Sequence, residues 1–154
     1  MLGWDNLKTG QVFHTAQVTI SAEEIIEYAA EFDPQPYHLD PEFAETSIFG
    51  GHCASGWHIC ALTMRLLADT QELNHLQLAN ASCVDTLRWF KPVFANNALH
   101  ASVQLSDFRS VSNSDYQGTA DLLVKVMNQD DQQVMELSIT CATTGLRPGV
   151  VGHE

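Results

Sequence analysis

Apolar and polar residues alternate in part along the second half of the chain, as they do in strands of a half-buried sheet. Four segments rich in valine, threonine, leucine and aromatic residues carry this pattern: residues 81–89, 99–108, 117–127 and 133–144. Turn-forming residues separate them at 91–97, 110–115 and 128–132, and we expect the last turn to be the tip of a hairpin. Residues 11–20 predict one more strand near the N-terminus.

The first half of the chain carries helix signals instead. Ser21 and Glu24 have the spacing of a capping box, in which each side chain satisfies a free backbone N–H of the first helical turn. We therefore predict an amphipathic helix that runs to about Phe32 and ends at Asp33, because Pro34 disfavours helical backbone in the residue before it. Residues 34–55 are expected to be irregular, apart from a helical turn near 41–45, and Pro34 and Pro36 should hold the loop between Asp33 and His38 in a stiff, extended form.

A second helix is predicted over residues 56–68. Apolar side chains occupy almost every position of this segment, and Arg65 is its only charge. A helix that is apolar on all sides must be buried on most of them, and this one is too short to cross a membrane. We therefore predict an α+β protein in which an antiparallel sheet wraps a central helix, which is the hot-dog fold. One domain should cover residues 1–154, with a frayed tail over 148–154.

Composition and charge narrow the class of protein. The chain has 154 residues, of which 45% are apolar, enough for one domain with its own core. Its net charge of −12 repels phosphate backbones, which excludes nucleic acid and anionic membranes as partners. No apolar stretch reaches the roughly 20 residues that span a bilayer, and no signal-peptide pattern is present, so we expect a cytoplasmic protein. The four cysteines show no Cys-x-x-Cys spacing and are expected to be reduced, buried thiols.

The strongest chemical signal follows the first helix. Residues 33–38 read Asp-Pro-Gln-Pro-Tyr-His, in which Asp33, Pro36 and His38 match the Asp-x-Asn-Pro-x-His motif of one enzyme family. The chain thus resembles the MaoC-like acyl dehydratases and (R)-specific enoyl-CoA hydratases. Gln35 departs from the family's asparagine but keeps the amide. The resemblance extends over about residues 5–146 and includes Ile48-Phe49-Gly50-Gly51, Ala54-Ser55-Gly56 and Leu87-Arg88-Trp89-Phe90-Lys91-Pro92-Val93, with Asn96-Asn97 in place of the usual Gly-Asp.

The chemistry that this resemblance implies gives each motif residue a role. Adding water to a 2-enoyl thioester needs a base for the water, an acid for the α-carbon, and donors for the enolate oxygen. Asp33 and His38 can grip one water between them, and an imidazole exchanges protons near neutral pH. Gly56 begins the apolar helix, where a free N–H and the helix dipole can stabilise the thioester oxygen. We expect these three to be the catalytic residues.

The remaining site residues are candidates for contacts with the substrate, an acyl-CoA or acyl-carrier thioester. His52 either lines the acyl tunnel or is structural, and Arg88 and Lys91 either meet phosphates or form a solvated strand end. No metal or other cofactor is expected, since no histidine spacing matches a zinc signature. Hot-dog tunnels usually form between two protomers, so we expect a homodimer. The substrate-binding candidates are Gln35, Phe49, Gly51, His52, Ser55, Trp57, Arg88 and Lys91.

Two other functions stay open at this point. A hot-dog thioesterase usually takes its carboxylate from the central helix, and the segment 56–68 contains no aspartate or glutamate. A non-catalytic acyl-binding or partner subunit is left open by Gln35 and by the missing Gly-Asp turn. Release of free thiol would indicate the thioesterase, and tight binding without hydration would indicate the binding subunit.

Overall fold

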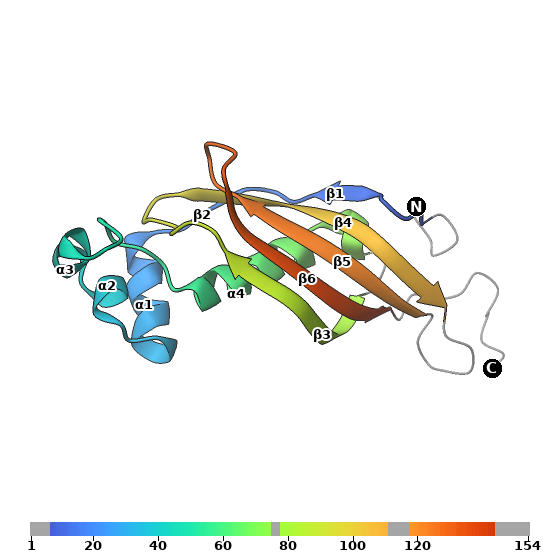
Figure 1. The fold of residues 1–154 in the computed structure, drawn as a ribbon, viewed down its shortest axis with the longest axis horizontal. Coiled ribbons are helices and arrows are strands. Elements are labelled where there is room, and N and C mark those ends of the chain that lie inside the picture. The colour runs from blue at the N-terminus through green and yellow to red at the C-terminus, as the bar shows by residue number, and fades with distance from the viewer. Residues whose placement is uncertain (1–6, 75–77, 111–117, 144–154) are drawn as a thin grey trace.

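A computed structural model describes residues 7–74, 78–110 and 118–143. Most of the predicted turn at 110–115 and the tail at 148–154 lie outside the described residues. The elements follow one another as predicted, with helices in the first half and long strands in the second (Figure 1). The strands are β1 (Val12–His14), β2 (Val18–Thr19), β3 (Leu78–Trp89), β4 (Ala98–Ser110), β5 (Gly118–Met127) and β6 (Gln133–Thr143).

The strands form one antiparallel sheet in the order β1-β4-β5-β6-β3, with β2 also paired to β4. The single N-terminal strand predicted over 11–20 is wrong, because β1 and β2 are separate. Between them, the Thr15 side chain takes over a backbone role, since its Oγ1 accepts the Ala101 N–H at 2.9 Å. The predicted hairpin tip is confirmed between β5 and β6, where the Asn128 N–H donates to the Gln132 carbonyl at 3.0 Å.

The helices are α1 (Ala22–Phe32), α2 (Pro36–Leu39), α3 (Pro41–Thr46), α4 (Gly56–Ala68) and α5 (Gln71–Asn74). The capping box of α1 is confirmed: the Glu24 N–H donates to Ser21 Oγ at 3.1 Å, and the Ser21 N–H donates to Glu24 Oε2 at 3.0 Å. The stretch 34–55 is more helical than predicted. Pro36 opens α2 instead of extending the loop, because its fixed φ suits the first position of a helix.

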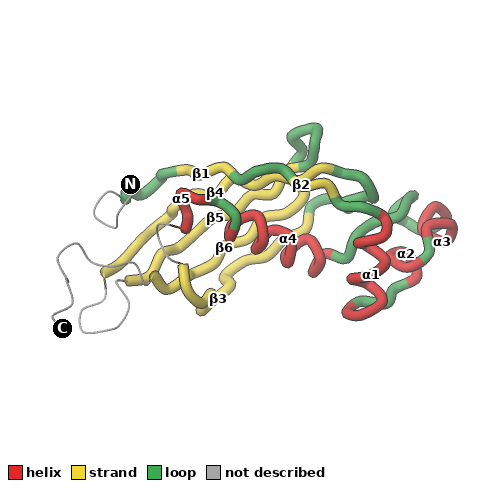
Figure 2. Tube along the Cα trace, turned by 180° about the vertical axis from the view of Figure 1, so that it is seen from behind, coloured by secondary structure: helices red, strands yellow, loops and turns green. Residues whose placement is uncertain are grey.

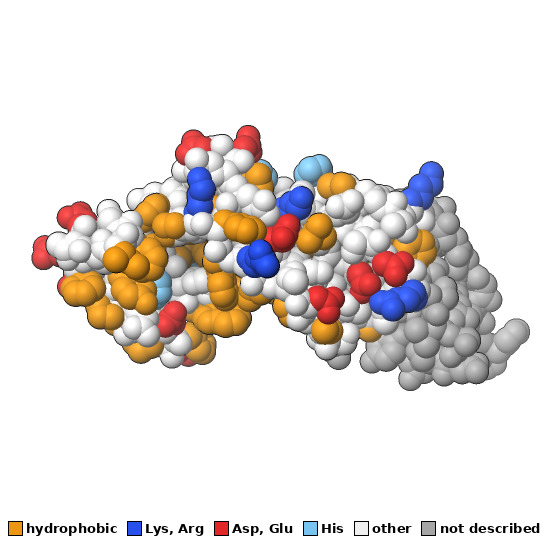
Figure 3. Space-filling view, viewed as in Figure 1, with side chains coloured by type: hydrophobic (Ala, Val, Ile, Leu, Met, Phe, Trp, Pro, Cys, Tyr) orange, Lys and Arg blue, Asp and Glu red, His pale blue; other side chains and the backbone are white. Residues whose placement is uncertain are grey.

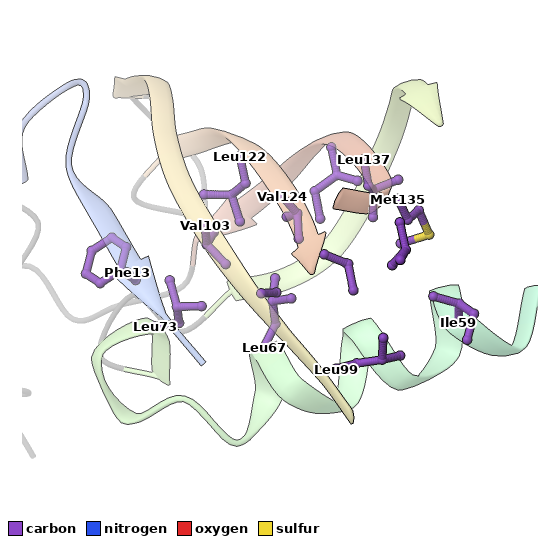
Figure 4. Packing of buried hydrophobic residues seen from close by; sticks show 14 of the residues in the cluster. Phe13, Ile59, Leu67, Leu73, Leu99, Val103, Leu122, Val124, Met135 and Leu137 are labelled. Atoms are coloured by element: carbon purple, nitrogen blue, oxygen red, sulfur yellow. The ribbon is translucent and has the colours of Figure 1, made fainter. Parts of the chain in front are cut away.

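Helix α4 packs along one face of the sheet, while α1, α2 and α3 gather beyond one end of it (Figures 1 and 2). Ile59 and Leu67 of α4 face alternate, fully buried side chains of β5, among them Leu122 and Val124 (Figure 4). Because side chains of a strand point alternately to the two sides of the sheet, every second residue faces the helix. The α+β hot-dog fold is therefore confirmed.

The predicted burial of α4 on most sides is wrong for the single chain. Trp57 is 58% exposed and Met64 is 40% exposed, whereas Ile59, Leu66 and Leu67 are buried. The physical reason is that the sheet covers α4 from one side only (Figure 2). Within the described ranges, no helix combines the length and apolar character that crossing a membrane requires.

Candidate active site

Asp33 stands at the end of α1 with its backbone fixed on both sides. Its N–H donates to the Ala29 carbonyl at 3.0 Å, and its own carbonyl accepts the Gln35 N–H at 2.8 Å. Pro34 follows and ends the helix, as predicted. The Asp33 side chain keeps 25% of its surface exposed. The carboxylate is therefore held by the local backbone at the junction of α1 and α2.

His38 lies on α2, and its ring is buried. Nδ1 lies 2.7 Å from the Cys53 carbonyl oxygen. We assign the ring proton to Nδ1 because a carbonyl oxygen can only accept a hydrogen bond. In the neutral ring Nε2 then carries the lone pair, and it faces Asp33 at 3.6 Å from Oδ2. That distance is too long for a direct hydrogen bond but suits two groups that contact the same small molecule.

Ser55 joins this pair from the start of α4. Its Oγ donates to Asp33 Oδ2 at 2.6 Å, and the side chain has no exposed surface. One carboxylate oxygen thus faces both the serine hydroxyl and the imidazole. The motif residues, which are separated from α4 in sequence, meet at its N-terminus.

Gly56 begins α4, as the sequence predicts, and lies directly against an indole ring. A Cβ at this position would lie 2.7 Å from Cε2 of Trp89, a distance that folded proteins do not tolerate. Trp89 Nε1 also donates to the Gly56 carbonyl at 3.0 Å. A side chain at position 56 would therefore force the Trp89 indole to move, a packing reason for glycine that has no local signal in the sequence.

These groups border a cavity of about 410 Å³. Asp33 and His38 supply its polar wall, and Gly56 lies at the helix end of it. Figure 3 shows apolar side chains on both sides of the hollow between the helical end and the sheet. Most of the cavity wall is apolar or aromatic, which suits an acyl chain. The residues around it are Asp33, Tyr37, His38, Phe49, Cys53, Ala54, Gly56, Trp57, Ile59, Trp89, Phe90, Lys91, Pro92, Val93 and Val134.

Comparison with known proteins agrees with this geometry. A family described as "MaoC like domain" matches residues 6–126. The chain belongs to the MaoC-like family. The uncharacterized protein YdeM of Bacillus subtilis is 30% identical over 132 residues, which cover 86% of this chain and 92% of YdeM. The 3-hydroxyacyl-thioester dehydratase Z of Mycobacterium tuberculosis is 31% identical over 110 residues, covering 71% of this chain and 73% of that protein. The crystal structure of the MaoC-like dehydratase from Rhodospirillum rubrum superposes with a TM-score of 0.83 at 32% identity, covering 96% of this chain and 99% of that one.

Several substrate-contact candidates of this MaoC-like chain lie outside the cavity wall. His52 is buried behind it, and its Nε2 lies 2.6 Å from the His38 carbonyl oxygen, so that it supports the backbone of α2. Gly51 packs against the ring of Phe94. A Cβ added at position 51 would lie 3.2 Å from Cδ1 of that ring. Gln35 and Arg88 are exposed, Gln35 as the N-cap of α2 and Arg88 on β3.

Phe49, Trp57 and Lys91 do line the cavity, together with Tyr37 and Trp89, for which the sequence predicts no contact with the substrate. Tyr37 lies one position before His38 and contacts Phe49 across the cavity wall, with ring centroids 5.0 Å apart. In the sequence Trp89 belongs only to the strand motif, whereas in the structure its indole contacts Gly56, 33 positions away. Such a contact has no local signal in the sequence, because it depends on how β3 lies beside α4.

Two further groups near the site favour their neutral forms. Burial raises the pKa of the Cys53 thiol, which keeps it protonated although it lies 3.9 Å from His38 Nδ1. Burial lowers the pKa of His58, which stacks on Tyr28 with ring centroids 4.4 Å apart. Within the described part of the chain, no three His, Cys, Asp or Glu side chains gather closely enough to hold a metal ion. All four cysteines are free, and Cys83 is exposed rather than buried as predicted, because it lies on the edge strand β3.

Proposed function

We propose that this chain is a hydratase or dehydratase that adds water to a 2-enoyl thioester, or removes it from the 3-hydroxyacyl thioester. The observation that carries this proposal is the pairing of a carboxylate and an imidazole across 3.6 Å, at the wall of an apolar cavity. Membership of the MaoC-like family supports the same reaction class. The 3-hydroxyacyl-thioester dehydratase Z, at 31% identity, is named for this chemistry.

In the hydration direction, Asp33 and His38 hold one water between them. Nε2 of His38 accepts a hydrogen bond from the water because Nδ1 already donates to Cys53. As the water oxygen bonds to C3 of the enoyl group, one water proton passes to the Asp33–His38 pair. The pair then returns a proton to C2 on the same face, so that one water is added and no redox change occurs. In dehydration the same steps run in reverse.

The thioester oxygen carries the negative charge that develops between these steps. We propose that the Gly56 N–H at the start of α4 donates to it, together with the positive end of the helix dipole. The Ser55 side chain does not cap this helix, so it leaves the first N–H groups of α4 to other acceptors. The catalytic set is therefore Asp33, His38 and Gly56.

The cavity suits an acyl chain attached to a phosphate-bearing carrier. Its wall is mainly apolar, and the exposed Lys91 supplies a cation at one side. Lys91 has no ion-pair partner among the residues that the structure describes. On a chain with net charge −12, such a cation gives a local contact for the phosphates of coenzyme A or of an acyl carrier.

The test is hydration of a short 2-enoyl-CoA, followed as loss of the enoyl absorbance. Asp33→Asn and His38→Ala should each lower kcat/KM by about 100- to 10,000-fold, the usual contribution of a general acid or base. Asp40→Asn and His14→Ala are matched controls, because Asp40 only caps α3 and His14 is exposed on β1. Wild-type rates in both site variants would refute the proposed function.

The same preparation separates the two alternatives. Release of free CoA thiol from a saturated acyl-CoA, without hydration of the enoyl-CoA, would assign a thioesterase. Cys53 does not favour that outcome, since burial raises its pKa and keeps the thiol neutral. Tight binding of acyl-CoA with neither reaction would assign a binding subunit.

We also propose that the working form is a homodimer. Val84, on the edge strand β3, is 53% exposed, and the outer side of α4 exposes Trp57 and Met64. An open strand edge beside apolar side chains favours pairing with a second copy of the chain. Sedimentation equilibrium should give the dimer mass for the wild type and the monomer mass for Val84→Lys. Val12→Lys, on the opposite edge strand β1, should stay dimeric; a monomeric wild type would contradict the proposal.

A further inference from the structure

Aromatic rings border the cavity on two sides, and they come from different parts of the fold. Tyr37 of α2 and Phe49, which follows α3, form what we call the helical wall. Trp89, the last residue of β3, and Phe90, which follows it, form the sheet wall. The hollow between these two parts of the molecule is visible in Figure 3. An acyl group bound beside the catalytic pair would therefore meet aromatic rings from both parts.

Contacts with neighbouring groups hold these rings in place. Tyr37 makes an edge contact with the catalytic imidazole, with ring centroids 4.6 Å apart, and packs tilted against Phe49 at 5.0 Å. Trp89 Nε1 donates to the Gly56 carbonyl at 3.0 Å, and its ring makes an edge contact with Trp57 at 5.1 Å between centroids. Side chains that are already held lose little conformational entropy when a ligand packs on them. Both walls are thus preorganised surfaces.

The cavity offers few polar groups to an acyl chain. The indole N–H of Trp89 is already used in its hydrogen bond to the start of α4. Burial raises the pKa of the Cys53 thiol and keeps it uncharged. The substrate contact predicted for Ser55 is wrong, because its side chain has no exposed surface and does not line the cavity. Lys91 is charged, but the proposed function assigns it to the carrier phosphates. The wall therefore favours an apolar acyl group.

The volume of the cavity suits a compact acyl group. It is about 410 Å³, near the lower end of the roughly 300–1,000 Å³ that ligand cavities span. A cavity of about 150 Å³ is already large enough for benzene. A six-membered ring therefore fits beside an enoyl thioester. Size alone admits aromatic and saturated rings equally, so the chemistry of the walls decides between them.

Aromatic walls distinguish an aromatic ring from a saturated one. The face of an aromatic ring is negative and its edge is positive, so that two such rings attract each other in edge and offset arrangements beyond the gain from buried area. The pairs Tyr37–Phe49 and Trp57–Trp89 already pack in tilted and edge arrangements. A saturated ring lacks this charge pattern and gains only the burial of its apolar surface.

We propose that the acyl group of the substrate carries an aromatic ring, which binds between the helical wall and the sheet wall. The inference rests on the proposed hydratase function and names the class of acyl group that this site takes. The ring lies beyond C3 of the enoyl group and takes no part in the addition of water. Its contacts with the walls raise kcat/KM for the thioesters that carry it.

The test compares three 2-enoyl-CoA substrates with the same number of carbon atoms. The first is 5-phenylpent-2-enoyl-CoA, the second is 5-cyclohexylpent-2-enoyl-CoA, and the third is the linear undec-2-enoyl-CoA. Methylene groups separate each ring from the double bond, so the enoyl group has the same intrinsic reactivity in all three. The phenyl substrate should exceed the cyclohexyl and linear substrates in kcat/KM by about 2- to 10-fold, the contribution of an aromatic pair.

Two variants check whether the walls create this preference. Phe49→Leu removes a ring from the helical wall, and Phe90→Leu removes one from the sheet wall, while each keeps an apolar side chain. In both variants the ratio of kcat/KM for the phenyl over the cyclohexyl substrate should fall towards one. Phe43→Leu is the matched control, because Phe43 is exposed on α3 and does not line the cavity. It should keep the wild-type ratio, and circular dichroism verifies that all three variants are folded.

Equal kcat/KM for the phenyl and cyclohexyl substrates in the wild type would overturn the inference, because burial of apolar surface would then account for binding. A faster linear substrate would overturn it too, as would a wild-type ratio in both wall variants.

Hydration of but-2-enoyl-CoA, which carries no ring, distinguishes this inference from the proposed function. If that substrate is hydrated, Asp33→Asn abolishes the reaction and the phenyl substrate has no advantage, only the aromatic specificity is refuted. If the wild type hydrates none of the four thioesters, the proposed function fails and the inference fails with it.

Discussion

Replacing Gly56 by alanine tests why a glycine opens α4. The new Cβ would lie 2.7 Å from Cε2 and 2.8 Å from Nε1 of Trp89. Ordinary contacts between carbon atoms are about 3.5–4.0 Å, so the indole has to retreat by roughly 1 Å. This movement strains its hydrogen bond to the Gly56 carbonyl, now 3.0 Å, and its edge contact with Trp57, now 5.1 Å between ring centroids.

The expected change in stability follows from these contacts. Losing the hydrogen bond costs about 0.5–1.5 kcal/mol, and losing the aromatic contact costs a similar amount. Alanine regains about 1 kcal/mol over glycine in a helix. The net loss for Gly56→Ala is therefore about 1 kcal/mol, which lowers Tm by about 2–4 °C in a chain of this size.

A double-mutant cycle makes this small effect decisive. In a Trp89→Leu background the indole is absent, so Gly56→Ala should stabilise the protein by up to about 1 kcal/mol instead of destabilising it. Urea denaturation followed by circular dichroism measures all four proteins. Phe90→Leu is the control background, because it removes the next aromatic side chain and keeps the Trp89 indole. There, Gly56→Ala should remain destabilising.

Additive effects of Gly56→Ala and Trp89→Leu would refute the reasoning, since the clash would then not be the reason for the glycine. Hydration rates add a second reading. If Gly56→Ala no longer destabilises the Trp89→Leu background but still slows its hydration, the glycine also serves the approach of the thioester to the backbone. If Gly56→Ala lowers neither the stability nor the hydration rate of Trp89→Leu, packing of Trp89 is a sufficient reason for Gly56.

Two further predictions concern stability. Burial lowers the pKa of His58 from its usual 6.5, with Glu24 raising it and His38 lowering it to smaller extents. The unfolded chain then takes up the proton first, so stability should fall as pH drops through 6.5 towards the lower folded pKa. His58→Phe keeps the stack on Tyr28 and should lose less stability from about pH 7 to about pH 5 in urea denaturation; equal losses would contradict this. Ser21→Ala removes the capping box and should cost about 1 kcal/mol in thermal unfolding, and an unchanged Tm would show that the cap does not stabilise α1.

The sequence alone determined the features that depend on neighbouring residues. The capping box at Ser21 and Glu24 and the beginning of α4 at Gly56 were predicted correctly. Caps, prolines and hydrophobic periods act within a few residues, so their signals can be read directly along the chain. The motif spacing also anticipated that Asp33 and His38 lie together, since a short segment joins them.

The tertiary structure decided how distant segments meet. The strand order β1-β4-β5-β6-β3, the exposure of Trp57 and Met64 on α4, and the approach of Trp89 to Gly56 have no local signal. Ser55 shows the reason most directly. Local rules predict that a serine before a helix caps it, yet this hydroxyl bonds a carboxylate 22 positions earlier. Folding brings that carboxylate within 2.6 Å of the hydroxyl, which donates to it a charge-assisted hydrogen bond that no neighbouring residue in the sequence predicts.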